Sequence, residues 1–300
     1  MLFLRFSAIP RLFCMIVLFA LKGLPLSVRR NLFAFFALGI YFLWPKGRSR
    51  MKKNAKLLRP DLSGGEIAAG IKRNLRTIAY SWAALLCNDP IFSEDSARRL
   101  LVDGIEPILE NAGKEKLVFA AAHVGPVDAL LEAVAAYGLR IYMPVEPVRP
   151  EWLGRFMLDM RGKFKGLTVE PIEKGKTLSR ASSRLAAGEA VLVAVDILRG
   201  WDAERRAICR VGNARVAFPV GAVGLAMMNN ARLIPVLSGQ DKFGRLKIRF
   251  LEPFSLLRTG NFRDDAKENT KRLINEIYAP HLQANWDSWT QLPWSDLSAA

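Results

Sequence analysis

The sequence predicts an α/β fold with a mostly parallel central sheet flanked by helices, preceded by an N-terminal membrane-associated helical segment. Three observations predict it. From residue 115 onward, short β-rich apolar runs alternate with helical patterns, which is the order of βαβ units. Residues 46–110 follow a helical period, and residues 1–45 hold two apolar runs. We therefore divide the chain into an anchoring segment, 1–45, and a single α/β domain, 46–300.

The anchoring segment contains the apolar runs Leu12–Leu21 and Leu32–Trp44. Neither reaches the roughly 18–20 apolar residues that span a bilayer. We expect a retained interfacial hairpin or one tilted helix within residues 8–45. A signal peptide is the alternative, but no clean small-residue cleavage site follows, and the second apolar run would be unexplained.

A basic cluster follows directly and contains no acidic residue. It consists of Lys46, Arg48, Arg50, Lys52, Lys53, Lys56 and Arg59. The net charge of +16 also indicates an anionic partner, either nucleic acid or an anionic membrane surface. Each basic side chain near such a leaflet contributes about 1 kcal/mol, and the positive-inside rule places the cluster on the cytoplasmic side. The chain lacks a nucleic-acid recognition motif, so we expect the membrane and no nucleic acid.

The domain is expected to begin with a helical lead-in at 46–110, followed by the central sheet at 115–255 and a C-terminal helix with a tryptophan-rich tail at 256–300. In the lead-in, an apolar stripe after the start signal Pro60–Ser63 predicts a core-facing helix. The stripe consists of Ile67, Ile71, Leu75, Ile78, Trp82, Leu85 and Leu86. In the tail, Trp286, Trp289 and Trp294 either pack on the core or lie at a membrane interface.

The sheet region contains six apolar runs that we interpret as strands. They are Leu117–Ala121, Leu139–Met143, Leu167–Val169, Ala190–Val195, Arg232–Leu237 and Leu246–Phe250. The last two are joined through Asp241–Gly244 and are expected to form an antiparallel hairpin. Helices are expected near 127–137, 151–163, 177–187, 219–230 and 264–279.

The candidate chemistry centres on His123, which closely follows the run 117–121 at the carboxyl end of a predicted buried strand. Ligands of open α/β sheets bind beyond those strand ends. Asp128 falls in the first turn of the next helix, where the helix dipole stabilises a carboxylate. A carboxylate that orients the imidazole leaves the other ring nitrogen as a general base. From these residues alone, a structural His–Asp pair is an equally open interpretation.

Two further acids follow predicted strands at the same edge of the sheet. Glu146 comes after Leu139–Met143, and Asp196 ends the strand Ala190–Val195. A single acid after a strand is often only a helix cap. Three strands that each deliver a polar group to one edge favour a site.

Other kinds of site find little support. The cysteines, Cys14, Cys87 and Cys209, fit no metal-ligand spacing, so no metal is expected. No Gly-x-Ser-x-Gly motif supplies a serine nucleophile. His281, the second histidine, has no acid arranged around it in the sequence, and we expect it to be structural.

The ordered motifs resemble those of the lipid A biosynthesis lauroyl/myristoyl acyltransferases and the related phosphatidylinositol mannoside acyltransferases. His123 and Asp128 match the His-x-x-x-x-Asp motif of this superfamily. Val145–Pro150 resembles the segment of the mannoside enzymes whose Glu belongs to the active site, here Glu146. The segments Val193–Asp196 and Val211–Gly221 resemble later blocks of the family.

The resemblance implies transfer of a fatty acyl group from a thioester to a lipid hydroxyl. His123 would be the general base, Asp128 would orient it, and Glu146 and Asp196 would position acceptor hydroxyls. Arg149 or backbone N–H groups would stabilise the oxyanion. Arg199, with Arg205 and Arg206, would hold phosphates; an exposed basic loop is the alternative interpretation.

The resemblance also implies the partners. The acceptor would be a membrane glycolipid such as a lipid A precursor, at the cytoplasmic face of the bacterial inner membrane. The donor would be acyl carrier protein, an acidic protein, or coenzyme A, as a co-substrate and without a cofactor. The alternatives are a lysophospholipid or phosphatidylinositol mannoside acyltransferase, and a non-enzymatic basic protein that binds membranes or nucleic acid. Acyl chain length and oligomeric state are not determined by the sequence.

Overall fold

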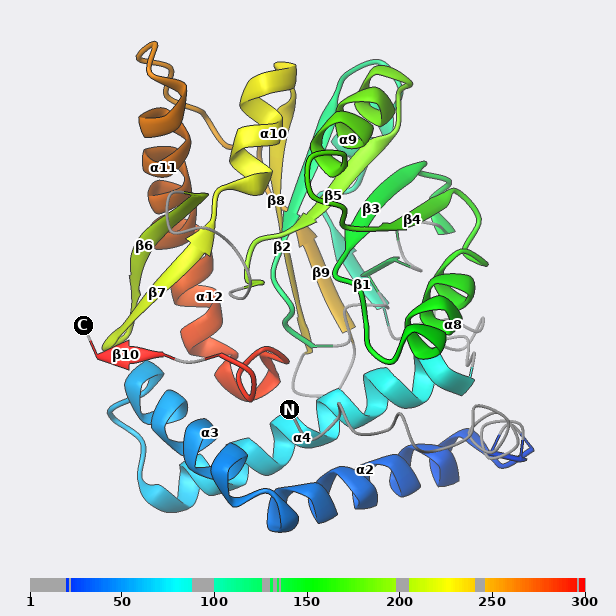
Figure 1. Cartoon of the computed structure of the whole chain (residues 1–300), viewed down its shortest axis with the longest axis vertical. Coiled ribbons are helices and arrows are strands. Elements are labelled where there is room, and N and C mark those ends of the chain that lie inside the picture. Colours follow the sequence, from blue (N-terminus) through cyan, green and yellow to red (C-terminus); the bar gives the residue numbers. More distant parts are fainter. Residues whose placement is uncertain are drawn as a thin grey trace.

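The computed structural model describes residues 20–21, 23–87, 100–125, 130–131, 134, 136–197, 205–240, 246–295 and 297–299 (Figure 1). The predicted α/β architecture is confirmed, because a seven-stranded sheet lies at the centre with helices packed on it. In spatial order the strands are β1 (Leu100–Asp103), β9 (Leu246–Phe250), β8 (Arg232–Gln240), β2 (Leu117–Ala121), β5 (Ala190–Ala194), β3 (Ile141–Val145) and β4 (Leu167–Pro171).

The sheet is mainly parallel. Strands β8, β2, β5, β3 and β4 pair in parallel, and β9 pairs antiparallel with β8, as the predicted hairpin requires. The edge strand β1 pairs in parallel with β9, so these two strands run against the other five. The strands that carry the candidate site residues, β2, β5 and β3, are consecutive neighbours and end at one edge.

Strand β2 shows how the sheet is buried on both faces. Val118 and Ala120 belong to the core cluster that includes residues of α9 (Thr177–Ala186), α10 (Gly221–Asn229) and α11 (Phe262–Leu273). Leu117 and Phe119 point to the opposite face, toward α6 (Glu106–Asn111). Successive side chains of a strand alternate between faces, so a strand covered on both sides must be apolar throughout.

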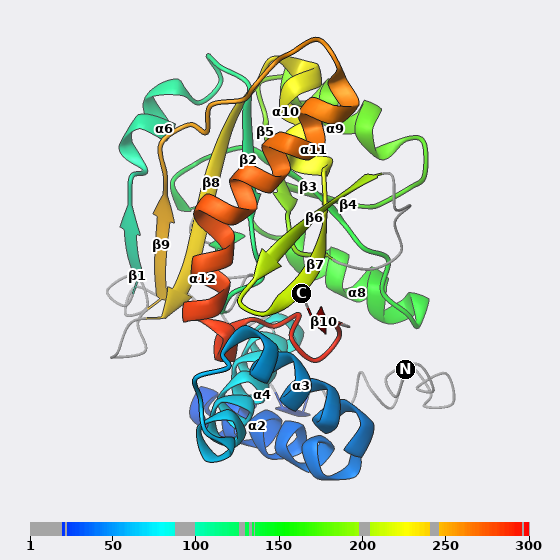
Figure 2. The ribbon, with the colours of Figure 1, turned by 90° about the vertical axis from the view of Figure 1, so that its left-hand side faces the viewer.

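Three N-terminal helices form a layer at the carboxyl end of the parallel strands (Figures 1 and 2). They are α2 (Leu26–Leu43), α3 (Pro45–Leu58) and α4 (Gly64–Cys87). The predicted start of α4 is a capping box: Glu66 Oε2 accepts from the Ser63 backbone N–H at 2.8 Å, and Ser63 Oγ accepts from the Glu66 N–H at 3.3 Å. The apolar stripe of α4 is buried, with Ile67, Ile71 and Leu75 in the core.

The C-terminal segment passes between this helical layer and the sheet (Figure 2). It continues from α11 through a π-helical turn, η3 (Ile274–Tyr278), then α12 (Ala279–Ala284) and a short 3-10 helix, η4 (Trp286–Ser288). It ends as β10 (Ser298–Ala299), the third strand of a small sheet with β6 (Arg206–Val211) and β7 (Ala214–Pro219). Trp286 and Trp289 are buried, so the tail packs on the core.

Several details differ from the sequence-based expectations. The lead-in 46–110 is not wholly helical, because β1 lies within it and pairs with β9, far along the chain. Strand β3 begins at Ile141 rather than at 139, and α8 (Glu151–Arg161) follows it. The hairpin of β6 and β7 was not predicted. Its two strands meet at Gly212–Asn213 and carry alternating rather than continuous apolar residues.

The expected anchoring segment is described only in part. Residues 1–19 and 22 lie outside the described residues, and α2 covers most of the second apolar run. Among the helices that the structure describes, none combines the length and the apolarity needed to cross a bilayer. Several large apolar side chains of α2 are nevertheless exposed, among them Phe35, Phe36, Phe42 and Leu43.

Candidate active site

His123 lies two residues beyond the carboxyl end of β2, where the chain leaves the sheet. The next residues hold that exit in place. Ser238 Oγ donates to the Val124 carbonyl at 2.8 Å, and Gly125 N–H donates to the Ser288 carbonyl at 2.8 Å. Gly125 has φ +72°, a left-handed conformation that strains residues with a side chain. These contacts direct the chain out of the sheet at His123 and leave its backbone little freedom to move.

Asp196 binds the imidazole of His123. It follows β5, the neighbour of β2, and its Oδ1 lies 2.7 Å from His123 Nδ1. Its Oδ2 accepts from the His123 backbone N–H at 2.8 Å. One carboxylate thus holds both the side chain and the backbone of the same histidine.

The environment of Asp196 keeps it ionised. The residue is 0% exposed. Burial alone would raise the pKa of its carboxyl, but the nearby imidazole and the hydrogen bonds from His123 and Trp289 hold that pKa below its usual range. With an ionised acceptor at Nδ1, the proton of a neutral His123 sits on Nδ1, and Nε2 carries the lone pair. The imidazole is partly exposed, at 24%. This arrangement can take a proton from a bound group.

The C-terminal segment supplies a site residue that no sequence motif indicates. Trp289 Nε1 donates to Asp196 Oδ2 at 2.7 Å. Thr290 N–H donates to the His123 carbonyl at 2.8 Å, next to an antiparallel bridge between Val124 and Trp289. Three tryptophans occur in the tail, and nothing local distinguishes this one.

The other predicted residues are distributed as follows. Glu146 comes directly after β3, at the same sheet edge as His123 and Asp196, and is half-buried; Arg149 is exposed on the following loop. Asp128 and Arg199 lie outside the described residues. Asp196 was expected to face an acceptor hydroxyl, but its carboxylate is fully buried against His123 and Trp289. Asp196 is the carboxylate that binds Nδ1.

His281 is held in a backbone environment. Its Nε2 lies 2.9 Å from the Ser238 carbonyl oxygen, and Asn285 Nδ2 lies 3.3 Å from its Nδ1. Burial lowers the pKa of this imidazole. Within the described residues, no group of three or more His, Cys, Asp or Glu side chains is placed to hold a metal ion.

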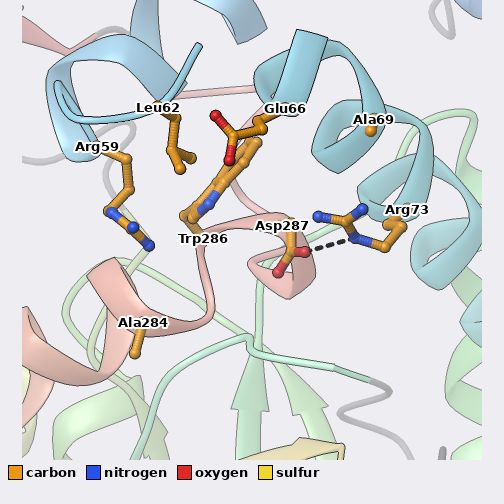
Figure 3. A pocket seen from close by; sticks show the side chains of 8 residues that line it. All are labelled: Arg59, Leu62, Glu66, Ala69, Arg73, Ala284, Trp286 and Asp287. Atoms are coloured by element: carbon orange, nitrogen blue, oxygen red, sulfur yellow. Dashed lines mark hydrogen bonds and ion pairs between the residues drawn. The ribbon is translucent and has the colours of Figure 1, made fainter. Parts of the chain in front are cut away.

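A pocket of about 270 Å³ lies between the helical layer and the segment around η4 (Figure 3). Its charged lining consists of Arg59, Arg73, Glu66 and Asp287, two bases and two acids. Arg73 Nε is paired with Asp287 Oδ2 at 2.7 Å, and Arg59 is paired with Asp61 outside the pocket at 2.6 Å. This balanced lining gives no net attraction for an anion.

A family model described as "Bacterial lipid A biosynthesis acyltransferase" matches residues 3–292. No curated protein matches the chain significantly. Among solved structures, a match is the 1-acyl-sn-glycerophosphate (LPA) acyltransferase, PlsC, from Thermotoga maritima. It is 14% identical, covers 85% of this chain and 98% of its own, and has a TM-score of 0.37.

Proposed function

The chain belongs to the bacterial lipid A biosynthesis acyltransferase family and is an acyltransferase, and we propose that it moves a fatty acyl group from an acyl thioester to a hydroxyl of a glycolipid such as a lipid A precursor. The observation that carries the proposal is the contact between His123 Nδ1 and the buried Asp196 carboxylate at a sheet edge. With Nδ1 bound to Asp196, Nε2 of the partly exposed imidazole is the nitrogen that we assign to the acceptor hydroxyl.

In the proposed reaction, His123 Nε2 removes the proton of the acceptor hydroxyl. The resulting oxygen attacks the thioester carbonyl, an ester C–O bond forms, and the C–S bond breaks. The imidazolium then returns the proton to the departing thiolate, so the products are an ester and a thiol. Asp196 stabilises the imidazolium and fixes its orientation, because its carboxylate already binds Nδ1. No covalent acyl-enzyme is required.

The remaining site residues keep their predicted roles as part of the proposal. Glu146 would hold an acceptor hydroxyl, supported by its position at the end of β3 next to β5. Arg149 or backbone N–H groups would stabilise the oxyanion, and Arg199 would hold a phosphate of the acceptor or donor. Asp128 stays a predicted catalytic residue. The structure describes neither Asp128 nor Arg199.

For the donor we propose acyl carrier protein, with acyl-CoA as the alternative. Acyl carrier protein is acidic, and this chain carries a net charge of +16. Such a pair should associate faster at low ionic strength. The chemistry needs no cofactor beyond this co-substrate.

We also propose that the helical layer rests on the cytoplasmic leaflet of the inner membrane. On α2, Phe35 is 72% exposed, Phe36 is 65% and Leu43 is 79%. The next helix, α3, carries basic residues without an acidic one. Exposed apolar side chains beside basic ones are typical of interfacial helices on anionic leaflets. Replacing both Phe35 and Phe36 with Ser should lower binding to anionic vesicles by at least about 10-fold in flotation assays.

The function is tested with the full chain in membranes, a set of acyl donors and a set of acceptors. The acceptors are a lipid A precursor, a lysophospholipid and a phosphatidylinositol mannoside, and products are identified by mass spectrometry. His123→Ala should lower the transfer rate per folded protein by at least about 10²-fold. The folded fraction is measured beside it, because the variant also removes the imidazole from the buried Asp196 carboxylate. An unchanged rate would overturn the assignment of the base. Transfer to a different acceptor would keep the reaction and replace the substrate.

A further inference from the structure

We propose that Trp289 is a positioning residue for the acyl transfer, acting through Asp196 on His123; this rests on the proposed role of His123 as the base. Trp289 comes from the C-terminal segment, 93 residues beyond Asp196. Neither the sequence motifs nor the sheet edge point to it.

One oxygen of the Asp196 carboxylate is bound by two N–H donors. Asp196 Oδ2 accepts from Trp289 Nε1 at 2.7 Å and from the His123 backbone N–H at 2.8 Å. With two donors fixed on Oδ2, Oδ1 can only point to His123 Nδ1, 2.7 Å away. Without the indole N–H, Oδ2 would keep one donor, the His123 backbone N–H, and both remaining contacts of the carboxylate would come from His123 itself.

Trp289 is itself held from both sides. Asn74 Nδ2, on α4, donates to the Trp289 carbonyl at 2.8 Å. On the other side, Val124 and Trp289 form an antiparallel bridge, and Thr290 N–H donates to the His123 carbonyl at 2.8 Å. The indole is 1% exposed, so it has no room to reorient. A donor fixed in this way costs no reorganisation when the imidazole becomes charged.

The indole N–H of Trp289 also changes the charge distribution on the Asp196 carboxylate. A hydrogen bond to a buried carboxylate stabilises its charged form and spreads its negative charge. Removing the N–H concentrates that charge on the side facing His123, which favours the imidazolium. A protonated imidazole cannot act as the base. The acid limb of the pH profile of kcat/KM should therefore move to higher pH.

A tryptophan that only fills the core would behave differently. Its loss would lower stability and the amount of folded enzyme, but it would not move a pH profile. Trp286 provides the matched control, since it lies in the same segment, is 3% exposed and packs its ring on Gly70 of α4. Trp289→Phe and Trp286→Phe remove the same ring volume, and only the first removes the donor to Asp196.

The experiment measures kcat and KM of both variants from about pH 5 to 9, beside the wild type and His123→Ala. We expect Trp289→Phe to lower kcat by about 10-fold, because the carboxylate that orients the base loses one of its donors. KM should change little, because the buried indole does not reach the substrate. The acid limb of its kcat/KM profile should move to higher pH by about half a pH unit. Trp286→Phe should keep the wild-type acid limb, whatever its effect on thermal stability.

If Trp289→Phe fails to fold, replacing Trp289 with 3-benzothienylalanine keeps the ring shape and removes only the N–H, and the same shifts are expected. An unmoved acid limb in either folded variant, with His123→Ala inactive, overturns the role of Trp289 alone. Activity retained in His123→Ala overturns the proposed base and this inference with it. A shift in Trp286→Phe equal to that of Trp289→Phe would also overturn the inference.

Discussion

Asp196→Asn tests how the imidazole is held. The oxygen at position Oδ2 faces two N–H donors, from His123 and Trp289. An amide must keep its oxygen there, so its NH₂ group is forced against His123 Nδ1. The imidazole can then hydrogen-bond only by moving its proton to Nε2. That tautomer has no lone pair on the nitrogen assigned to proton removal.

The magnitude follows from the contacts that the active tautomer would lose. With the proton kept on Nδ1, the variant loses a hydrogen bond to a charged group, about 1.5–3 kcal/mol, and buries opposed donors, about 1–3 kcal/mol more. The sum is about 2.5–6 kcal/mol, or roughly 10²–10⁴-fold in rate at 1.36 kcal/mol per factor of ten. Because Asp196 and His123 act as one unit, the double variant with His123→Ala should be little slower than His123→Ala alone.

The assay follows acyl transfer from acyl carrier protein by mass spectrometry, with protein amounts corrected for the folded fraction. Asp265→Asn is the matched control, because this carboxylate is also buried and binds Thr259 N–H and Oγ, at 2.8 and 2.6 Å, away from the site. Its rate should equal that of the wild type. If Asp196→Asn stays within about ten-fold of the wild type, Asp196 does not orient the base. Asp128→Asn, assayed in parallel, then shows whether the second predicted carboxylate does.

Three further predictions concern stability. Gly70→Ala should destabilise by about 1–3 kcal/mol in urea unfolding, because its Cβ would overlap the Trp286 ring; an unchanged midpoint would contradict that packing. Tyr278→Phe should cost about 1–3 kcal/mol, since the hydroxyl donates to the Ala120 carbonyl at 2.5 Å and accepts from Val236 N–H at 3.3 Å; equal stability of the two proteins would refute this. The lowered pKa of Asp196 contributes stability that is present above its unfolded value, about 3.9, and lost as pH falls through the folded value. The free energy of unfolding should therefore fall less steeply with decreasing pH in Asp196→Asn than in the wild type. Equal slopes in the two proteins would contradict a lowered pKa of Asp196 in the folded protein.

Strands β2, β5 and β3 were predictable because they are continuous apolar runs between turn residues, as strands buried on both faces require. The hairpin of β6 and β7 followed another rule. Its residues alternate between buried and exposed, and Gly212–Asn213 is a two-residue turn signal of the kind that joins antiparallel strands. The sequence therefore contains a hairpin signal at this position, although the hairpin was not among the predicted elements.

The position of His123 was predictable, and its contact with Asp196 was not. Topology brings the ends of β2, β5 and β3 to one edge, which the order of strands and helices implies. Which carboxylate meets Nδ1 depends on a few ångströms at the exit of β2. Local spacing favoured Asp128, five residues away, whereas Asp196 is 73 residues away and binds the backbone N–H of His123 as well. A pattern of residue types does not contain that second contact.

Trp289 shows that the C-terminal segment contributes a residue to the proposed site and does not only pack on the core. A carboxylate with 0% exposure is very costly unless N–H donors replace its water, and here the donors come from the exit of β2 and from the tail. The tail is in turn bound to the helical layer, since Asn74 donates to the Trp289 carbonyl and Asn54 to those of Leu292 and Ser295. A site with a water-exposed carboxylate could form without the tail. Here Trp289 of the tail donates to the buried Asp196 and is bound by Asn74 of α4, so one segment links the layer proposed to rest on the membrane with the proposed base.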